Sequence, residues 1–173
     1  MNIILLGYMG CGKSSIGKEL ASELDMKYLD LDDYLETQEE KSIKKIFEDK
    51  GEIYFRKKES EYLKKVLNES VNTIISLGGG TPCFAGNIEL IKENVHCKSI
   101  YLKTSLDELV DRLFVERHAR PLIAHIDKKP DLKDFIRKHL FERSFYYNQA
   151  EYVVSTDSKT VNQIAQEIKN VLL

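Results

Sequence analysis

The chain has 173 residues, of which 42% are hydrophobic and 31% are charged, and its formal net charge is −2. This length suits one domain, residues 1–173, with a sizeable core, and the balanced charge lacks the basic excess that is typical of nucleic-acid-binding proteins. Cys11, Cys83 and Cys97 are odd in number and far apart, which excludes a disulfide framework or a zinc pattern. The apolar start, residues 1–6, is too short for a signal peptide or a membrane span. We therefore expect a cytoplasmic protein that binds neither nucleic acid nor membrane.

Short apolar runs alternate with helical patterns along the whole chain. The expected strands lie at 2–6, 27–31, 71–77, 97–103 and 151–156. The expected helices lie at 13–24, 34–70, 87–95, 105–117, 132–150 and 159–173. We expect a break in the long helical segment near Gly51 and a loop at 118–131, which contains two prolines. Strands that alternate with helices predict a parallel sheet covered on both faces, so the expected fold class is α/β.

Glycines, a lysine and a serine gather in the segment 7–14, "GYMGCGKS", between the first expected strand and helix. The segment fits the P-loop pattern G-x-x-x-x-G-K-[ST] in the context that this pattern requires. Glycines that take positive φ let backbone N–H groups turn inward around phosphate oxygens, at the positive end of the helix. Lys13 can reach the β- and γ-phosphates, and the Ser14 hydroxyl can ligate Mg²⁺. The candidate residues for binding a nucleoside triphosphate are Gly10, Cys11, Gly12, Lys13, Ser14 and Ser15.

Two alternatives remain open at this segment. The first is an incidental glycine-rich turn, which the flanking strand and helix disfavour. The second concerns Cys11, whose thiol would be reactive among inward N–H groups but inert if the side chain points into the core. The base-reading N-K-x-D motif of GTPases does not occur in the chain, so a GTPase is excluded.

Acidic side chains cluster where the second expected strand ends, in "YLDLDD". Side chains alternate along a strand, so we expect Asp30 and Asp32 on one face and Asp33 on the other, at the edge of the sheet beside the P-loop. One carboxylate could order water around Mg²⁺, while the other could accept a proton or hydrogen bond from a substrate hydroxyl. Alternatively, Asp32 or Asp33 caps the helix that follows.

Further along the chain, three consecutive glycines follow the third expected strand, and arginines occur at 56, 120 and 143. Consecutive glycines permit close approach of the backbone to a ligand carboxylate or hydroxyl. Each arginine taken singly is also compatible with a solvated surface position. The four histidines show no metal-ligand spacing, and we expect them on the surface.

The order and spacing of six segments carry a resemblance. "GYMGCGKSSIGKELA", "YLDLDDYLE", "GEIYFRKKE", "SLGGGTP", "ARPL" and "ERSFYYNQA" together resemble shikimate kinases over nearly the whole chain. The resemblance implies a three-layer P-loop kinase fold with a five-stranded parallel sheet flanked by helices and a mobile lid. It also implies transfer of the γ-phosphate of ATP, with Mg²⁺, to the 3-hydroxyl of shikimate. We also expect a monomer. In this pattern the P-loop is 7–14, a substrate-binding helical region spans about 31–62, and the lid spans about 113–129.

The same resemblance assigns roles to single residues. Asp30 joins the Mg²⁺ water shell, and Asp32 binds the shikimate hydroxyls. Arg120 moves from the lid onto the transferring phosphate, so the catalytic set is Lys13, Asp32 and Arg120. The shikimate carboxylate is bound by Arg56, Arg143 and the backbone of Gly78, Gly79 and Gly80. Apart from the resemblance, we expect the tyrosines to be packing residues, with Tyr147 as a candidate helper for Arg143.

The chain departs from the family pattern in the stretch "LFVERHA", which is one residue longer than is common. The arginine that stacks on adenine is therefore either Arg112 or Arg117. Two other functions stay open: another small-molecule kinase of this fold, such as gluconate kinase, and an ATP-binding regulator without catalysis. The combination of F-R-x-x-E, G-G-G and R-P-L disfavours the first, and intact Lys13, Ser14, Asp32 and Arg120 disfavour the second.

Overall fold

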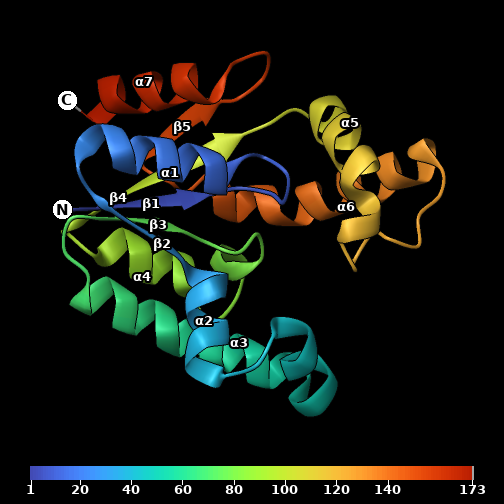
Figure 1. Cartoon of the computed structure of the whole chain (residues 1–173), viewed down its shortest axis with the longest axis horizontal. Coiled ribbons are helices and arrows are strands. Elements are labelled where there is room, and N and C mark those ends of the chain that lie inside the picture. The colour runs from blue at the N-terminus through green and yellow to red at the C-terminus, as the bar shows by residue number, and fades with distance from the viewer. Residues whose placement is uncertain (173) are drawn as a thin grey trace.

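A computed structural model describes residues 1–172, which form three layers with a sheet in the middle (Figure 1). The strands are β1 (Asn2–Leu6), β2 (Lys27–Asp30), β3 (Thr73–Ser76), β4 (Cys97–Lys103) and β5 (Tyr152–Ser155). The α-helices are α1 (Lys13–Leu24), α2 (Leu31–Glu39), α3 (Ile43–Glu69), α4 (Asn87–Glu93), α5 (Leu106–Glu116), α6 (Lys129–Tyr147) and α7 (Val161–Leu172). Two short 3₁₀ turns are η1 (Thr81–Cys83) and η2 (Arg117–Ala119). The predicted α/β class is confirmed.

The sheet is parallel throughout, with the strand order β2-β3-β1-β4-β5. Its central strand β1 is buried along its full length, which explains its continuous apolar run. Helices α1 and α7 cover one face, while α3 and α4 cover the other (Figure 1). The crossover that leaves β1 runs to β2, whereas the crossover that leaves its neighbour β3 runs the opposite way to β4, and ligands of open parallel sheets bind at such a switch point.

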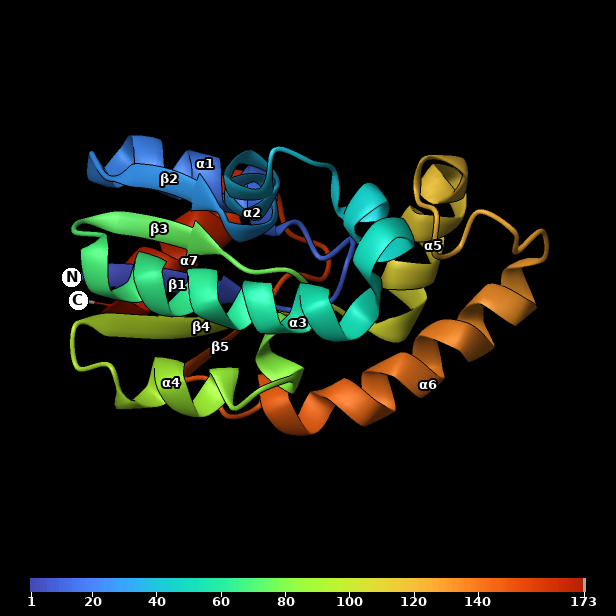
Figure 2. The ribbon, with the colours of Figure 1, turned by 90° about the horizontal axis from the view of Figure 1, so that it is seen from below.

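Helices α5 and α6 lie side by side beyond the carboxyl ends of the strands (Figure 2). The α6 helix begins at Lys129, earlier than expected, because Pro130 is tolerated in a first helical turn. The predicted loop before it is held to the core by Ile123, which is fully buried, and by Ile126. None of the helices within residues 1–172 combines the length and the apolar character that a bilayer crossing requires.

The prediction that Asp30 and Asp32 share one face of a strand is wrong. Strand β2 ends at Asp30, and the next residue already belongs to α2. The Asp30 carboxylate is the N-cap of α2: its Oδ1 accepts hydrogen bonds from the backbone N–H of Asp32 at 3.0 Å and of Asp33 at 3.4 Å. Capping stabilises the helix at this residue and so ends the strand early. Neither Asp32 nor Asp33 is the cap that the sequence suggested.

The predicted break near Gly51 is confirmed. Gly51 has φ 80° and ψ 175°, a conformation that interrupts α3 and that only glycine adopts readily. Beyond this kink α3 runs alongside the sheet (Figure 2), and Arg56 lies on this part of the helix. The kink therefore positions one of the candidate binding residues.

Candidate active site

The P-loop closes around its own lysine. Gly10 and Gly12 have φ of 79° and 97°, as inward-facing N–H groups require, and Gly12 is the N-cap of α1. Lys13 Nζ donates hydrogen bonds to the carbonyl oxygens of Gly7 at 2.8 Å and Tyr8 at 3.0 Å. The ammonium group is thereby held at the centre of the loop, where it faces the space that phosphates would occupy.

A cavity of about 320 Å³ opens beside this loop at the carboxyl edge of the sheet. The predicted residues that line it are Gly10, Gly12, Lys13, Ser14, Ser15, Asp30, Asp32, Gly78, Gly79 and Arg120. Ser14 Oγ donates a hydrogen bond to Asp30 Oδ2 at 3.4 Å. The hydroxyl predicted to ligate Mg²⁺ and the carboxylate predicted to order its water are therefore neighbours. The fold thus brings together residues that lie more than a hundred positions apart in the sequence.

Asp32 is half-buried and lines this cavity. Burial, together with the nearby carboxylates of Asp30 and Glu59, raises the pKa of Asp32 to about 7, although Lys13 and Arg56 oppose the shift. A carboxyl group whose pKa lies near neutrality can exchange a proton at physiological pH.

At each glycine of the 78–80 segment, one side chain of the site packs closely against the backbone, in the space that a Cβ atom would crowd. A Cβ atom on Gly78 would lie 2.8 Å from Asp32 Oδ1, and one on Gly80 would lie 2.8 Å from Arg56 Nη2. A Cβ atom on Gly79 would lie 3.4 Å from Arg143 Nη1. The predicted close approach at these glycines is therefore made by side chains of the site.

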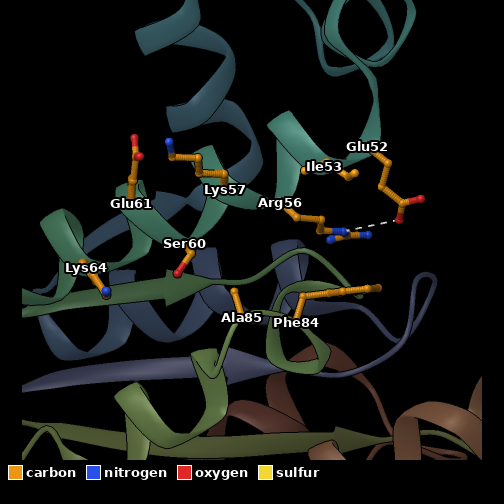
Figure 3. A pocket seen from close by; sticks show the side chains of 9 residues that line it. All are labelled: Glu52, Ile53, Arg56, Lys57, Ser60, Glu61, Lys64, Phe84 and Ala85. Carbon is orange, nitrogen blue, oxygen red and sulfur yellow. Dashed lines mark ion pairs between the residues drawn. The ribbon is translucent and has the colours of Figure 1, made fainter.

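Arg56 is held by a buried partner that the sequence reasoning missed. Its Nη1 lies 2.8 Å from Oε2 of Glu59, which is only 1% exposed and also accepts a 2.6 Å hydrogen bond from Thr81 Oγ1. The guanidinium carbon of Arg56 lies 4.1 Å from the centre of the Phe84 ring. Oε1 of Glu52 lies 3.7 Å from Arg56 Nε (Figure 3). Arg56 Nε itself is buried without a hydrogen-bond partner. The sequence does indicate this pair, because Arg56 and Glu59 lie three positions apart in "FRKKE" and so share one face of a helix.

A second cavity, of about 370 Å³, lies between α3 and α6. Arg56, Phe84, His139 and Arg143 are among its lining residues. Next to Arg143 on α6, the fully buried Tyr147 donates its hydroxyl to the Gly79 carbonyl oxygen at 2.5 Å. Tyr147 therefore fixes the glycine that Arg143 approaches.

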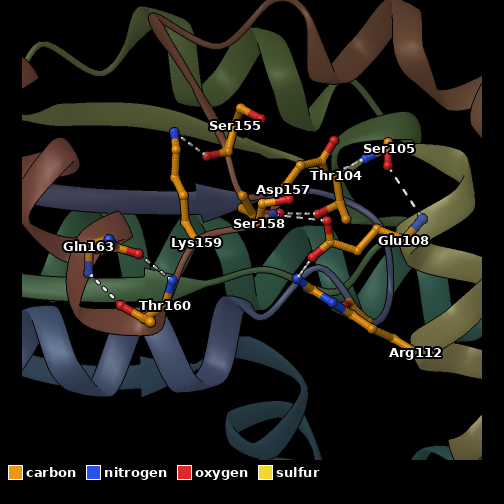
Figure 4. Close-up of polar contacts among 12 residues, drawn as sticks. Thr104, Ser105, Glu108, Arg112, Ser155, Asp157, Ser158, Lys159, Thr160 and Gln163 are labelled. Atoms are coloured by element: carbon orange, nitrogen blue, oxygen red, sulfur yellow. Dashed lines mark hydrogen bonds and ion pairs between the residues drawn. The ribbon is translucent and has the colours of Figure 1, made fainter.

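The two arginines proposed for adenine stacking occupy different places. Arg112 Nη1 donates to the Gly10 carbonyl at 3.2 Å and its Nη2 pairs with Glu108. Glu108 Oε2 also accepts from the backbone N–H of Ser158 at 3.3 Å, which joins α5 to the loop before α7 (Figure 4). Arg117, in contrast, lies over the Phe114 ring at 4.1 Å and donates to the Phe114 carbonyl at 2.6 Å. Only Arg112 is in contact with the P-loop.

Arg120 reaches the P-loop cavity from the segment after η2. Its Nη2 and Nε lie 2.6 Å and 3.1 Å from Oε2 of Glu116, one helical turn earlier, and both residues line the cavity. Its cationic group thus faces the same space as Lys13.

Comparison with known proteins identifies the family of this chain. The shikimate kinase family model matches residues 9–173. A shikimate kinase of Flavobacterium johnsoniae is 49% identical over 170 residues, which are 98% of each chain. The structure of shikimate kinase from Bacteroides thetaiotaomicron superposes with a TM-score of 0.90 at 34% identity, and it covers 99% of this chain and 98% of that chain.

The chain belongs to the shikimate kinase family. It catalyses the ATP-dependent phosphorylation of shikimate, a step in aromatic biosynthesis. A shikimate kinase from Acinetobacter baumannii, solved in complex with shikimate, has a TM-score of 0.86 at 29% identity, covering 99% of this chain and 92% of that one. The three-layer P-loop fold predicted from the resemblance to shikimate kinases is confirmed.

One histidine prediction is wrong. His96, His118 and His125 are exposed as expected, but His139 is half-buried in the wall of the second cavity. Its position on the inner face of α6 follows from the burial of Ile136 and Tyr147 on the same helix. The spacing of the histidines in the sequence carries no information about the burial of His139.

The structure favours the inert alternative for Cys11, whose side chain is 1% exposed in the core. Reaction with a thiol reagent requires access to the thiolate, so native Cys11 should be alkylated at least about 10-fold more slowly than in the unfolded chain. ATP should not change this rate. Mass spectrometry of the alkylated peptides measures both. Rapid labelling of Cys11 that ATP suppresses would instead support a reactive P-loop thiol.

Proposed function

We propose that the enzyme transfers the γ-phosphate of ATP to the 3-hydroxyl of shikimate across the junction between the two cavities. The observation that carries this proposal is the contact of Gly78, Gly79 and Gly80 with Asp32, Arg143 and Arg56 respectively. An acid, two guanidinium groups and a backbone turn are thereby gathered next to the P-loop. This arrangement suits a small substrate that bears a carboxylate and hydroxyl groups.

The second cavity is the proposed site of the shikimate carboxylate. Arg56 and Arg143 would bind it with planar, bidentate donors, which lysines cannot offer. Support comes from Arg56 Nε, a buried donor with no hydrogen-bond partner among the described residues, although Glu52 Oε1 lies 3.7 Å away. Glu59 and Phe84 hold the guanidinium group in place, so little side-chain freedom is lost on binding.

In the P-loop cavity, Lys13 and the surrounding N–H groups of Gly10 to Ser15 would bind the β- and γ-phosphates. Arg112, fixed on the Gly10 carbonyl by Glu108, is the proposed partner of adenine. Arg120 would exchange Glu116 for the transferring phosphate, as part of a mobile lid at about 113–129. The P-loop at 7–14 and the substrate-binding region at about 31–62 complete the proposed organisation of one domain.

The residues near Ser14 fit Mg²⁺. The Ser14 hydroxyl and the Asp30 carboxylate are oxygen donors 3.4 Å apart. Mg²⁺ at kinase sites is usually held by one or two protein oxygens together with substrate phosphates and water. We propose that Ser14 ligates Mg²⁺ and that Asp30 orders its water; the bound ion would neutralise charge on the β- and γ-phosphates.

Asp32 is the proposed proton acceptor. As the shikimate oxygen forms its bond to the γ-phosphorus, the hydroxyl proton passes to an Asp32 oxygen and ADP leaves with the electrons of the broken bond. Lys13 and Arg120 stabilise the charge on the transferring group. We propose that the enzyme is a monomer that acts in the cytoplasm.

Replacing Arg143 with alanine tests the carboxylate site. The loss of a charge-assisted pair, about 1.5–3 kcal/mol, should raise the shikimate KM by roughly 10- to 150-fold, with a smaller effect on kcat. Coupled measurement of ADP release gives both constants. Arg137→Ala is the matched control, because Arg137 lies on the same helix, is exposed and pairs with Asp134. An unchanged shikimate KM in Arg143→Ala would remove Arg143 from the site.

A further inference from the structure

The P-loop and helix α6 are joined by one hydrogen bond between side chains. The Tyr8 hydroxyl lies 3.0 Å from His139 Nδ1, and Tyr8 is 1% exposed. The two rings meet edge to face, with centroids 6.1 Å apart. Phe135, one turn earlier on α6, packs against the imidazole at 4.5 Å. The orientation of the His139 ring is therefore fixed by the P-loop and by its own helix.

The protonation of this pair follows from its surroundings. Burial raises the pKa of Tyr8, while Arg143 opposes the shift, so the hydroxyl keeps its proton and can donate it to His139 Nδ1. Burial and the neighbouring Arg143 lower the pKa of His139, against a smaller effect of Glu142, which favours a neutral imidazole. With Nδ1 accepting from Tyr8, the proton of the neutral ring resides on Nε2.

His139 lines the same cavity as Arg56 and Arg143, and it precedes Arg143 by one helical turn. Nδ1 is turned towards Tyr8, so Nε2 is the ring nitrogen available to the cavity. Within residues 1–172, no hydrogen-bond partner of Nε2 is found. An N–H donor without a partner beside two guanidinium groups is suited to an anionic or hydroxylated ligand.

We infer that His139 Nε2 is a third, uncharged donor to the carboxylic-acid substrate, and that Tyr8 of the P-loop fixes the tautomer that makes it one. The inference rests on the proposed carboxylate site. It adds a substrate-binding residue and makes the P-loop part of the acid-binding site, because the loop that holds the phosphates also orients a donor to the second substrate.

Two substitutions separate the two ring nitrogens. His139→Gln places an amide group near the position of Nε2 and removes Nδ1, whereas His139→Asn keeps a group near Nδ1 and removes Nε2. We expect the shikimate KM to stay within about 3-fold of wild type in His139→Gln and to rise about 10-fold in His139→Asn, which loses one hydrogen bond to a charged group. The ATP KM should be unchanged in both. The reverse order, or no change in either variant, would overturn the inference.

Tyr8→Phe tests the tautomer. It should raise the shikimate KM in the wild-type background and have little further effect in His139→Asn, a non-additivity that a double-mutant cycle measures. Additive effects would show that Tyr8 does not act through His139. The matched controls are His96→Gln and His96→Asn, at an exposed position before β4, with thermal melting as a check of folding. If Arg143→Ala also leaves the KM unchanged, the carboxylate site itself is wrong; if only the His139 variants are silent, the inference alone fails.

Discussion

Replacing Asp32 with asparagine is expected to lower kcat for shikimate phosphorylation by about 100-fold or more, the usual contribution of a proton acceptor. Asparagine preserves the shape of the side chain and its approach to Gly78, but it cannot take up the hydroxyl proton. ATP binding, which depends on the P-loop, should change little. Single-turnover phosphorylation and equilibrium binding of ATP measure these two quantities separately. Wild-type rates in Asp32→Asn would exclude Asp32 as the acceptor.

The same substitution should stabilise the unliganded protein at alkaline pH. The pKa of Asp32 is raised from 3.8 to about 7 in the folded chain. Between about pH 4 and pH 7 the folded state therefore keeps a proton that the unfolded state has released, so stability falls as the pH rises through this window. Asp32→Asn should consequently have a higher Tm than the wild type at pH 8 in Mg²⁺-free buffer, and the difference should shrink towards pH 4. A lower Tm for the variant at pH 8 would contradict this.

Replacing Arg120 with alanine is expected to lower kcat by about 1,000-fold, the lower range for an arginine that contacts a transferring phosphoryl group. The shikimate dissociation constant should change much less, because Arg120 lies on the P-loop side of the site, paired with Glu116. The charge that it stabilises develops only during transfer.

Lys128→Ala provides the matched control for Arg120, since Lys128 is an exposed cation of the same proposed lid. Its kcat should stay near the wild-type value. If Arg120→Ala weakened shikimate binding and left kcat intact, Arg120 would belong to the carboxylate site, and the lid proposal would be wrong.

Features governed by local chemistry were predictable from the sequence. The β1 strand, the P-loop and α1 follow from an apolar run, glycines and a helical pattern within a short segment. The break at Gly51 was equally visible, because glycine alone tolerates that backbone conformation.

Features that depend on competition or on distant contacts were not predictable. Asp30 could extend β2 or cap α2, and the cap prevailed because it satisfies two backbone donors of the helix. The contact of Arg112, and not of Arg117, with the Gly10 carbonyl also depends on the packing of α5 against the P-loop, which no local pattern encodes. The hydrogen bond between Tyr8 and His139 joins residues 131 positions apart, and no sequence pattern in either segment indicates it.

The central claim is that one end of the site binds the carboxylate of shikimate and the other binds the phosphates of ATP. The most direct test is a crystal structure of the enzyme with shikimate, ADP and Mg²⁺. We predict that the shikimate carboxylate lies between Arg56 and Arg143, that its 3-hydroxyl lies within hydrogen-bond distance of Asp32, and that ADP occupies the P-loop. A carboxylate bound at Lys13 or Arg120, with Arg56 and Arg143 free of substrate, would contradict the proposed site.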